Sequence, residues 1–594
     1  MPGINAQGAS GVTPDDELNT TQWAAAIALM LALLVPLAVL LAVWFKKRYA
    51  QAVVRLQSTT VTHEAPAHAP MPKPDLAPDE AVATPELVMR VVPAGAMAPA
   101  TPGRDPTDPA RRLRRRVLLL QFVAGLMYWW TLLLVVGIAF AYLDSVTSEP
   151  TKTTEALPAF VMHLLLWPLL FLPVALAWAF QAGLPERRVW AATGIALVAF
   201  SVGMAFSGAG WLIGLGFAGL CALLALMLAT FIRPAVRGAG PPLVAAFTVG
   251  LLSFSALMWL GTLLDSSPDD ELVGWTDWLL ALLVLAVLLG VAAFASWRML
   301  LRLARRYADK RFSELQLALG AYWALITAFS LTLVLLLSFE ERTGASMEWL
   351  GLAILIVWVA WRWLQRMALW VALRRAPAPL GPLLLLRVFK PSNRSEAFTD
   401  RFLARWRFAA PVWMIAGPDL AGAYMEPDEF FAFLRRRLHE RFITRADQLP
   451  QALAAMDNAR DPDGRFRVNE LFCANTTWQA TVLALIERAG VVMLDLREYT
   501  PERAGTHFEL EELLRRAPLH KVLLVVGPHE KLPQIQAGIA DIWRSVAHLR
   551  PATGPQPCLN IVQIGAGSDA EMWGLFRAVA AAATANDGVH PTAP

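Results

Sequence analysis

The chain has 594 residues and a formal net charge of +4, and 56% of its residues are hydrophobic while only 17% are charged. This composition lies outside that of ordinary soluble proteins and indicates that much of the chain faces lipid. The three cysteines lie far apart, with no CxxC pair and no histidine cluster, so we expect no disulfide framework and no metal site. A nucleic-acid partner is not expected either.

The first predicted element is a transmembrane helix over residues 23–45, an apolar run of the about 20 residues that a bilayer requires. Residues 1–22 contain acidic side chains and no basic one, whereas Lys46, Lys47 and Arg48 follow the run directly. Basic residues concentrate on the cytoplasmic side of membrane helices, so we expect residues 1–22 to form an extracytoplasmic tail. The same charge pattern argues against a cleaved signal peptide.

Residues 46–116 are predicted to form a disordered cytoplasmic linker. Pro, Ala, Thr and His dominate between 57 and 110 without hydrophobic periodicity. Such a composition buries too little apolar surface to offset the chain entropy that folding removes. A run of arginines beginning at Arg111 ends the linker and marks the inner edge of the next span.

The region 117–375 is predicted to form a membrane bundle of about eight helices. Arginines and acidic residues alternate at the ends of its apolar runs, so with the first helix we expect nine spans, the N-terminus outside and the C-terminus inside. The expected location is the inner (plasma) membrane, with the lipid bilayer as a partner. The predicted spans are 117–142, 158–181, 189–207, 209–232, 243–264, 275–297, 316–338 and 347–370, where 189–207 and 209–232 are also compatible with one re-entrant pair.

The middles of these spans carry almost no ionisable side chains. Proton relays and ion pathways need such groups inside the bundle, so a transporter is the less expected function. Arg362, between Trp361 and Trp363, is predicted to reach the lipid headgroups. The basic stretch 297–312 is predicted to be an ordinary cytoplasmic extension of a span, with a surface for anionic lipids as the alternative.

Residues 381–585 are predicted to form a cytoplasmic α/β domain with a doubly wound, mostly parallel sheet, and residues 586–594 a disordered tail. Short runs that are apolar throughout alternate here with amphipathic helical patterns, as strands buried on both faces do. The predicted strands are 383–389, 411–417, 490–496, 521–527 and 558–565, and the predicted helices lie near 394–408, 427–443, 476–488, 506–517, 531–549 and 569–583.

Charged residues and glycines follow several of these strands. Arg387 ends the first predicted strand, Gly417 and Asp419 follow the second, and Asp495 and Arg497 follow the third. Ligands of open parallel sheets bind outside the carboxyl ends of the strands. We therefore expect these residues to lie on one rim and to form a pocket for a polar ligand of nucleotide size.

The helix after the third predicted strand opens with Gly505 and Thr506 and carries Glu509 in its first turn. Thr506 at the N-cap and Glu509 three residues later have the spacing of a capping box. The same place, at a helix N-terminus beside the strand ends, also suits a carboxylate that attacks an anomeric carbon. The sequence leaves both interpretations of Glu509 open.

The segment from Gly505 to Leu510, Gly-Thr-His-Phe-Glu-Leu, follows a buried strand and an Asp. This arrangement resembles the nucleoside 2-deoxyribosyltransferase family and its relatives, the TIR-like and SLOG-like Rossmannoid domains that bind or cleave nucleotides. The likeness covers about residues 476–527, and no family is recognised for the membrane part. The resemblance implies that Glu509 is the glycosyl nucleophile.

The chain departs from the transferase pattern at Arg503, which stands where the family has an acidic residue that handles the proton of the base. Asp495 or Glu498 would have to supply that proton instead. Arg497 and Arg503 suit a phosphate group, through bidentate charge-assisted hydrogen bonds. The expected ligand is therefore a nucleotide or NAD rather than a free nucleoside, and no cofactor is required.

Residues 459–470 approach the spacing of an EF-hand calcium loop. Ala459, however, stands where the first Asp ligand belongs, and Pro462 stiffens the turn. We expect a Pro-Asp-Gly turn rather than a calcium site.

Two functions from different classes follow from these patterns. In the first, the membrane part anchors an N-glycoside hydrolase or ribosyl transferase that acts on nucleotides. In the second, the same pocket binds a nucleotide without turnover, and the membrane part is the output of a signalling protein. Glu509 separates the two, because an enzyme needs this carboxylate free in the pocket. A homo-oligomer is compatible with either function.

Overall fold

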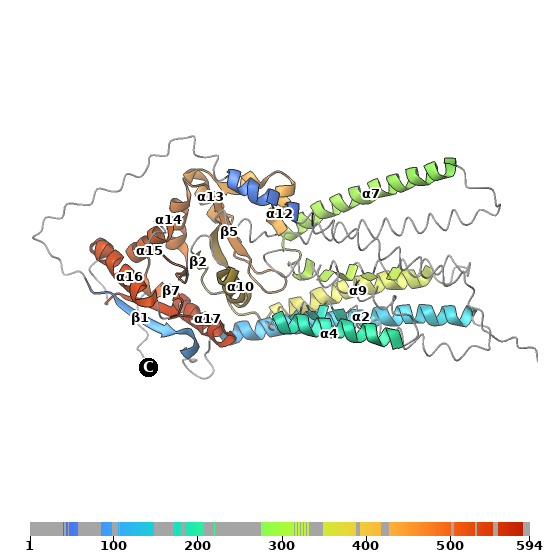
Figure 1. The fold of residues 1–594 in the computed structure, drawn as a ribbon, viewed down its shortest axis with the longest axis horizontal. Coiled ribbons are helices and arrows are strands. Elements are labelled where there is room, and N and C mark those ends of the chain that lie inside the picture. The colour runs from blue at the N-terminus through green and yellow to red at the C-terminus, as the bar shows by residue number, and fades with distance from the viewer. Residues whose placement is uncertain are drawn as a thin grey trace, which may run out of the picture.

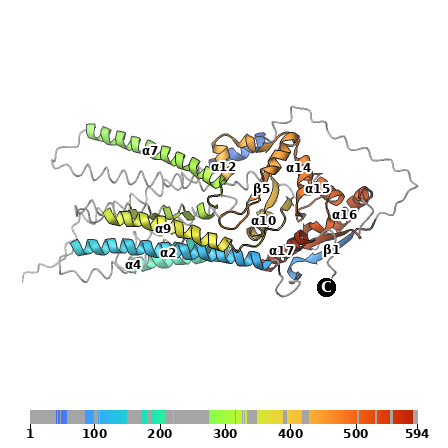
Figure 2. The ribbon, with the colours of Figure 1, turned by 180° about the vertical axis from the view of Figure 1, so that it is seen from behind.

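The computed structural model consists of a set of long helices and an α/β domain that lies at one end of them (Figure 1). The view from behind shows the same arrangement, with the N-terminal end of α2 (Thr107–Thr147) beside the α/β domain (Figure 2). The described residues are 40–56, 85–97, 105, 107–147, 171–179, 186–206, 219, 275–313, 315–331, 348–387, 393–416, 427–500, 504–528, 531–550 and 556–585, with short gaps inside 40–56, 171–179 and 315–331.

Long apolar helices make up the first part. The helices α2 and α9 lie side by side: the indole Nε1 of Trp361 donates to the carbonyl of Ala124 at 2.9 Å, and the rings of Tyr128 and Trp361 lie 4.7 Å apart. Besides α2, the long helices are α4 (Glu186–Phe206), α7 (Trp275–Ala308) and α9 (Glu348–Leu373).

Four of the predicted spans, 117–142, 189–207, 275–297 and 347–370, coincide with α2, α4, α7 and α9 and are confirmed as helices. Two segments among the described residues, Thr107–Val135 and Trp349–Leu373, are long and apolar enough to cross a membrane, which is a finding on length and composition alone. Membrane crossing therefore stays a prediction. The predictions for 1–22, 23–45, 209–232, 243–264 and 586–594 fall largely or wholly outside the described residues, and those for 158–181 and 316–338 partly so.

The α/β domain is built on one sheet of eight strands that all pair in parallel. The predicted parallel sheet is confirmed, and β2, β3, β6, β7 and β8 lie where the apolar runs predicted them. The strand order is β1-β8-β7-β6-β2-β3-β5-β4, with the bounds Val88–Pro93 (β1), Leu383–Arg387 (β2), Val412–Ala416 (β3), Phe442–Ile443 (β4), Val468–Cys473 (β5), Val491–Asp495 (β6), Val522–Val526 (β7) and Cys558–Gln563 (β8).

Helices cover both faces of this sheet, as a doubly wound architecture requires. Successive strand residues point to opposite faces, so Leu384 packs in one core with Leu513, while Leu385 packs in the other with Phe402. The helices of the domain are α10 (Asn393–Trp406), α12 (Pro427–Leu434), α13 (Leu449–Ala454), α14 (Trp478–Arg488), α15 (Ala504–Arg516), α16 (Leu532–Val546) and α17 (Asp569–Thr584), with 3-10 turns η2 (Ala94–Ala96), η4 (Leu438–Arg441), η5 (Ala446–Gln448), η6 (Leu519–Lys521) and η8 (Ala547–Leu549).

Residues 88–97 correct the prediction that 46–116 is a disordered linker. They form β1, which pairs with β8 along its whole length, and the turn η2, which packs on α17. The approach is close, because a Cβ added at Gly574 of α17 would lie 1.8 Å from the carbonyl oxygen of Ala94. The backbone of an edge strand is satisfied by one neighbour, so a six-residue segment needs no long apolar pattern to join the sheet. The α/β domain therefore includes a strand that lies far upstream of residue 381.

The start of the predicted linker is ordered as well. Residues 47–56 are helical, and Tyr49 and Val53 are buried against Phe442 and Phe472 of the α/β domain. The hydroxyl of Tyr49 donates to Glu429 at 3.0 Å. Two buried apolar side chains one helical turn apart are enough to hold this short helix on the domain.

The segment 457–467, called the docking loop below, joins the α/β domain to the end of α7. Asp457 forms an ion pair with Lys310, and Asp461 accepts from Arg467 at 2.9 Å. The same Arg467 donates to the carbonyl of Tyr307 at 2.6 Å and lies over the Tyr307 ring. The carboxylate of Asp461, part of the EF-hand-like pattern, is therefore engaged in an ion pair at the junction of the two parts.

The tip of the docking loop lies between α2 and α9. Gly464 has φ = +84°, and a Cβ at this position would lie 2.8 Å from Leu373 and 3.6 Å from Leu113. Leu113 lies near the N-terminal end of α2, and Leu369 lies near the C-terminal end of α9. Both belong to the same hydrophobic core as residues of α10 and α17. The long helices and one face of the sheet therefore share a continuous core.

Candidate functional site

The order in which the chain adds strands to the sheet reverses between the neighbouring strands β2 and β6. From β2 the chain passes through α10 to β3, and from β6 it passes through α15 to β7 on the opposite side. The helices α10 and α15 cover different faces, because Phe402 and Leu513 belong to different cores. In open parallel sheets a crevice opens at such a point, outside the carboxyl ends of the strands. Two predicted rim residues, Arg387 and Asp495, are register partners here.

Three charged side chains form what we call the rim cluster: Arg387, Asp495 and Arg497. Arg387 and Asp495 are buried at the last positions of their strands. Arg497 donates to both oxygens of Asp495, at 2.9 Å from Nε and 2.6 Å from Nη2, and its guanidinium lies 3.6 Å from the centre of the Phe398 ring. The cluster contains two cations, Arg387, which is buried, and Arg497, which is half-buried, and one carboxylate, a combination that suits an anionic ligand.

Asp495 and Arg497, predicted as an acid and a phosphate ligand, are thus brought together. The bidentate ion pair fixes Asp495 and Arg497 against each other, and the proton donation by Asp495 stays a prediction. Gly417, Asp419 and Arg503 lie outside the described residues, so their predicted roles are untested.

The helix α15 begins at Ala504, so Gly505 and Thr506 lie in its first turn and Thr506 is not the N-cap residue. The predicted capping box is therefore absent from the helix, and Thr506 is instead buried. Its position has a simple cause: Thr506, Glu509, Leu510 and Leu513 follow the spacing of one helix face, and that face is turned to the core.

Glu509 is a buried carboxyl group in this stripe, with a side chain that is only 2% exposed. Its Oε2 atom has no hydrogen-bond partner among the described residues. Burial raises the pKa of Glu509 to about 8, so the protonated form dominates at neutral pH. A protonated carboxyl group is a poor nucleophile, although it can donate a proton or a hydrogen bond.

The loop after β8 is occupied by a carboxylate of its own chain. The backbone N–H groups of Gly565 and Ser568 donate to Glu571, each at 2.7 Å, and Ser568 caps α17. Burial alone would raise the pKa of Glu571, but the hydrogen bonds from Ser568 and Gly565 outweigh it and lower that pKa. An external anion would have to displace Glu571 from these donors.

Side chains that the sequence did not single out complete the surroundings of the rim cluster. The ring of Phe398, on α10, packs against the guanidinium of Arg497. Arg401 of the same helix donates to the carbonyl of Gly567 at 2.7 Å. Burial lowers the pKa of Arg401, and the nearby cations Arg405 and Arg497 add to this effect. Helical spacing from the strand end could have pointed to Phe398, but no pattern in the chain pairs α10 with the loop after β8.

Within the described part of the chain, no group of three or more His, Cys, Asp or Glu side chains is arranged to hold a metal ion. Comparison with known proteins gives no match to a family model, to a curated protein or to a solved structure. The resemblance of residues 505–510 to the deoxyribosyltransferase-like domains therefore stays a prediction.

Proposed function

We propose that this chain is a multi-pass membrane protein whose cytoplasmic α/β domain binds a nucleotide at the rim cluster and transmits binding to the membrane helices without turning the ligand over. The observation that carries the proposal is the register of Arg387 beside Asp495, together with the ion pair between Asp495 and Arg497, at the point where the strand order reverses. Guanidinium groups at this point of a parallel sheet offer charge-assisted contacts to phosphate.

The surface of the long helices supports the membrane part of the proposal. Large apolar side chains are more than half exposed on each of the four, in a pattern that would cost a soluble protein a great deal of free energy. Examples on α2, α4, α7 and α9 are Leu134, Ile195, Leu279 and Leu352.

The shared core supports the transmission part of the proposal. Leu113 of α2 and Leu369 of α9 pack in the same cluster as Phe398, the residue beside Arg497. Phe398 itself contacts the rim cluster through the Arg497 guanidinium. A ligand that moves Arg497 would therefore act on a side chain that shares a hydrophobic core with the long helices. Coupling of this kind requires that the two sites bias a common element.

Binding without turnover is favoured over catalysis by the burial of Glu509. One observation keeps an N-glycoside-cleaving enzyme as the second candidate: a buried carboxyl group with a raised pKa and no partner for Oε2 is also typical of catalytic acids. In that case Glu509 would need access to the ligand, which a rearrangement at the start of α15 would have to provide.

Nucleotide binding is tested on the full chain in detergent, with ATP, AMP and NAD as probes and the thermal unfolding midpoint as the readout. We expect at least one of these to raise the midpoint, and Arg387→Gln to weaken its binding roughly ten-fold or more, since a charge-assisted hydrogen bond is lost. Arg544→Gln is the matched control, because Arg544 is an exposed arginine of α16 far from the rim in sequence and topology. No shift with any probe, or equal binding by Arg387→Gln, would refute the proposal.

Turnover is tested on the same samples by chromatography of the free base. Binding without turnover predicts no base release from the wild-type chain. Release that is abolished by Glu509→Gln, with nucleotide binding retained, would establish the enzyme instead.

A further inference from the structure

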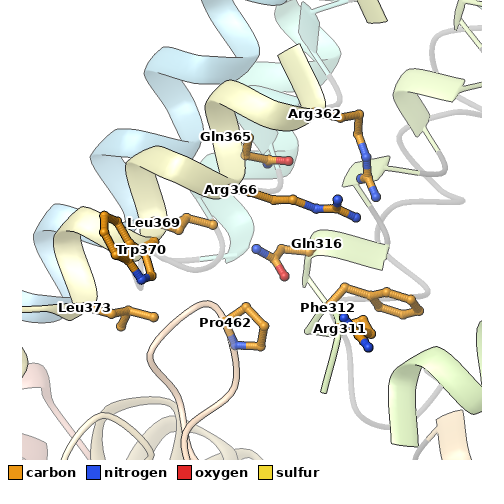
Figure 3. A pocket seen from close by; sticks show the side chains of 10 residues that line it. All are labelled: Arg311, Phe312, Gln316, Arg362, Gln365, Arg366, Leu369, Trp370, Leu373 and Pro462. Carbon is orange, nitrogen blue, oxygen red and sulfur yellow. The ribbon is translucent and has the colours of Figure 1, made fainter. Parts of the chain in front are cut away.

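A second cationic site lies away from the rim cluster, in a cavity of about 180 Å³ between α9, the segment after α7 and the docking loop (Figure 3). Arg362, Gln365 and Arg366 line it from α9, Arg311 and Gln316 from the facing segment, and Pro462 from the docking loop. A water molecule fills roughly 30 Å³ of liquid, so the cavity has room for a phosphate-sized group. It is situated where the long helices meet the α/β domain.

The charge of this cavity is uncompensated within the described residues. None of its lining residues is acidic, and its three guanidinium groups form no ion pair or side-chain hydrogen bond with the described part of the chain. The charged groups that act on Arg362 are Arg366 and Arg306, which are also cations. Three like charges facing one space repel each other unless an anion lies between them.

Neighbouring cations of the same junction behave differently. Lys310 is paired with Asp457, and Arg467 is paired with Asp461. Arg465 is paired with Asp463 at 2.6 Å. Arginines at the inner ends of membrane helices are common. Among the described residues, the absence of carboxylate partners around the cavity is therefore a local feature, in a junction that otherwise pairs its charges.

Two amide side chains add neutral donors to the cavity. Gln316 accepts from the backbone N–H of Ser313 through Oε1 at 2.9 Å, and its amide nitrogen points into the space between α9 and Pro462 (Figure 3). Gln365 is only 4% exposed, lines the cavity, and makes no side-chain hydrogen bond within the described region. An amide that lines a cavity can donate to a group inside it, so Gln365 suits a ligand that accepts hydrogen bonds.

A glycine, Gly320, allows the two walls of the cavity to approach each other closely. A Cβ on Gly320 would lie 2.7 Å from Nη1 of Arg362, so the glycine leaves the guanidinium room between α9 and the facing segment. Arg362 thereby lines the cavity, and its predicted reach to the lipid headgroups stays a prediction.

We propose that this cavity binds a phosphate group, with Arg311, Arg362 and Arg366 as its cationic contacts and Gln316 and Gln365 as neutral donors. Guanidinium groups match phosphate oxygens in charge and in bidentate geometry. The phosphate group belongs either to an anionic lipid of the adjacent leaflet or to a soluble phosphate compound. Because Pro462 closes the cavity, a bound phosphate group fixes the docking loop against α9 and so stabilises the attachment of the α/β domain.

The test uses the full chain and the thermal unfolding midpoint, with two probes that separate the sources. One arm compares bilayer discs of phosphatidylcholine alone with discs that also contain phosphatidic acid, and the other adds inorganic phosphate to the chain in detergent, with chloride at equal ionic strength as reference. We expect stabilisation in at least one arm; a response to phosphatidic acid alone identifies a lipid headgroup, and a response to inorganic phosphate identifies a soluble ligand.

The variant for both arms is Arg311→Gln combined with Arg366→Gln, which should weaken the response ten-fold or more in probe concentration. Both side chains are exposed, so the fold should persist, and circular dichroism verifies it. Arg374→Gln combined with Arg375→Gln is the matched control, with the same loss of charge at the end of α9 but outside the cavity. The proposal is overturned if neither probe stabilises the chain, or if both double variants respond as the wild type does.

Discussion

At the scale of single residues, the protonation state of Glu509 depends on the helix face that carries its side chain. The spacing Thr506, Glu509, Leu510 and Leu513 is that of an amphipathic stripe, and the stripe faces the core. A glutamate in such a stripe is protonated at neutral pH rather than ionised, because the apolar surroundings penalise its charge. Glu509 would instead be the N3 residue of a capping box if α15 began three residues later, at His507.

The first residue-scale prediction is that Glu509 makes stability fall as the pH rises. The pKa of Glu509 is about 8 in the folded chain and 4.5 as a reference for the unfolded chain, so the folded state binds the proton more tightly. Its contribution to the free energy of unfolding is fully present below pH 4.5 and is lost progressively up to about pH 8, by an amount on the order of 5 kcal/mol. Glu509→Gln, which cannot ionise, should remove this loss.

The measurement is the unfolding midpoint of the full chain in detergent from pH 6 to pH 9. Glu511→Gln is the control, because Glu511 lies on the same helix and is only partly buried. We expect the wild type and Glu511→Gln to lose stability over this range and Glu509→Gln to change less. Parallel curves for all three proteins would show that the Glu509 carboxyl group is solvated.

At the scale of elements, some strands are easier to predict from the sequence than others. The runs 383–389, 490–496 and 521–527 are mainly apolar because their strands are buried on both faces, and the strand ends lie within two residues of the predicted ones. Strand β5, Val-Asn-Glu-Leu-Phe-Cys, is only partly buried and carries polar residues, so it does not resemble a central strand. The predicted helix 427–443 also ends early, at Leu434, before Arg436 adopts φ = +57°.

Strand β1 could not be predicted for a different reason. Its partner β8 lies more than 460 residues away, between Val88 and Cys558. A short edge strand gains most of its stability from that partner, and local composition is dominated by the proline-rich surroundings. The rim cluster depends on long-range register in the same way: the sequence identified Asp495 and Arg497, but not their alignment with Arg387.

An element-scale prediction concerns the contact between η2 and α17. In Gly574→Ala the added Cβ would overlap the carbonyl oxygen of Ala94, at 1.8 Å, so either η2 moves away or α17 shifts. Helix propensity alone would favour alanine by about 1 kcal/mol, yet we expect a net destabilisation of roughly 1–3 kcal/mol from overpacking. Amide exchange in β1 should become faster, because the turn that anchors the strand is displaced.

Gly538→Ala in α16 is the matched control, since a Cβ there would meet no atom within 4 Å. This variant should be more stable than the wild type by roughly 0.5–1 kcal/mol. Urea unfolding and hydrogen exchange of the full chain measure both effects. Equal stabilisation of the two variants, with unchanged exchange at residues 88–93, would mean that β1 does not depend on the contact with α17.

At the scale of the whole molecule, the pairing of β1 with β8 constrains the membrane topology. Strands of one sheet lie on one side of any membrane, so residues 88–93 and 558–563 share a side, and the contact of Tyr49 with Glu429 adds residue 49 to it. The number of membrane crossings between residues 97 and 383 must therefore be even. The eight spans predicted for 117–375 satisfy this condition, whereas a reading with seven or nine would not.

The last prediction follows from this parity and from the arginines at the inner ends of the helices. Reporter fusions or insertions at residues 100 and 590 should both report the cytoplasm, and one at residue 150, after the acidic end of α2, should report the opposite side. The measurement pairs a reporter active only in the cytoplasm with one active only outside it. Opposite sides for residues 100 and 590 would be incompatible with β1 in the sheet, and a cytoplasmic signal at residue 150 would mean that α2 does not cross the membrane. The two results are independent, so the experiment tests the sheet and the membrane bundle separately.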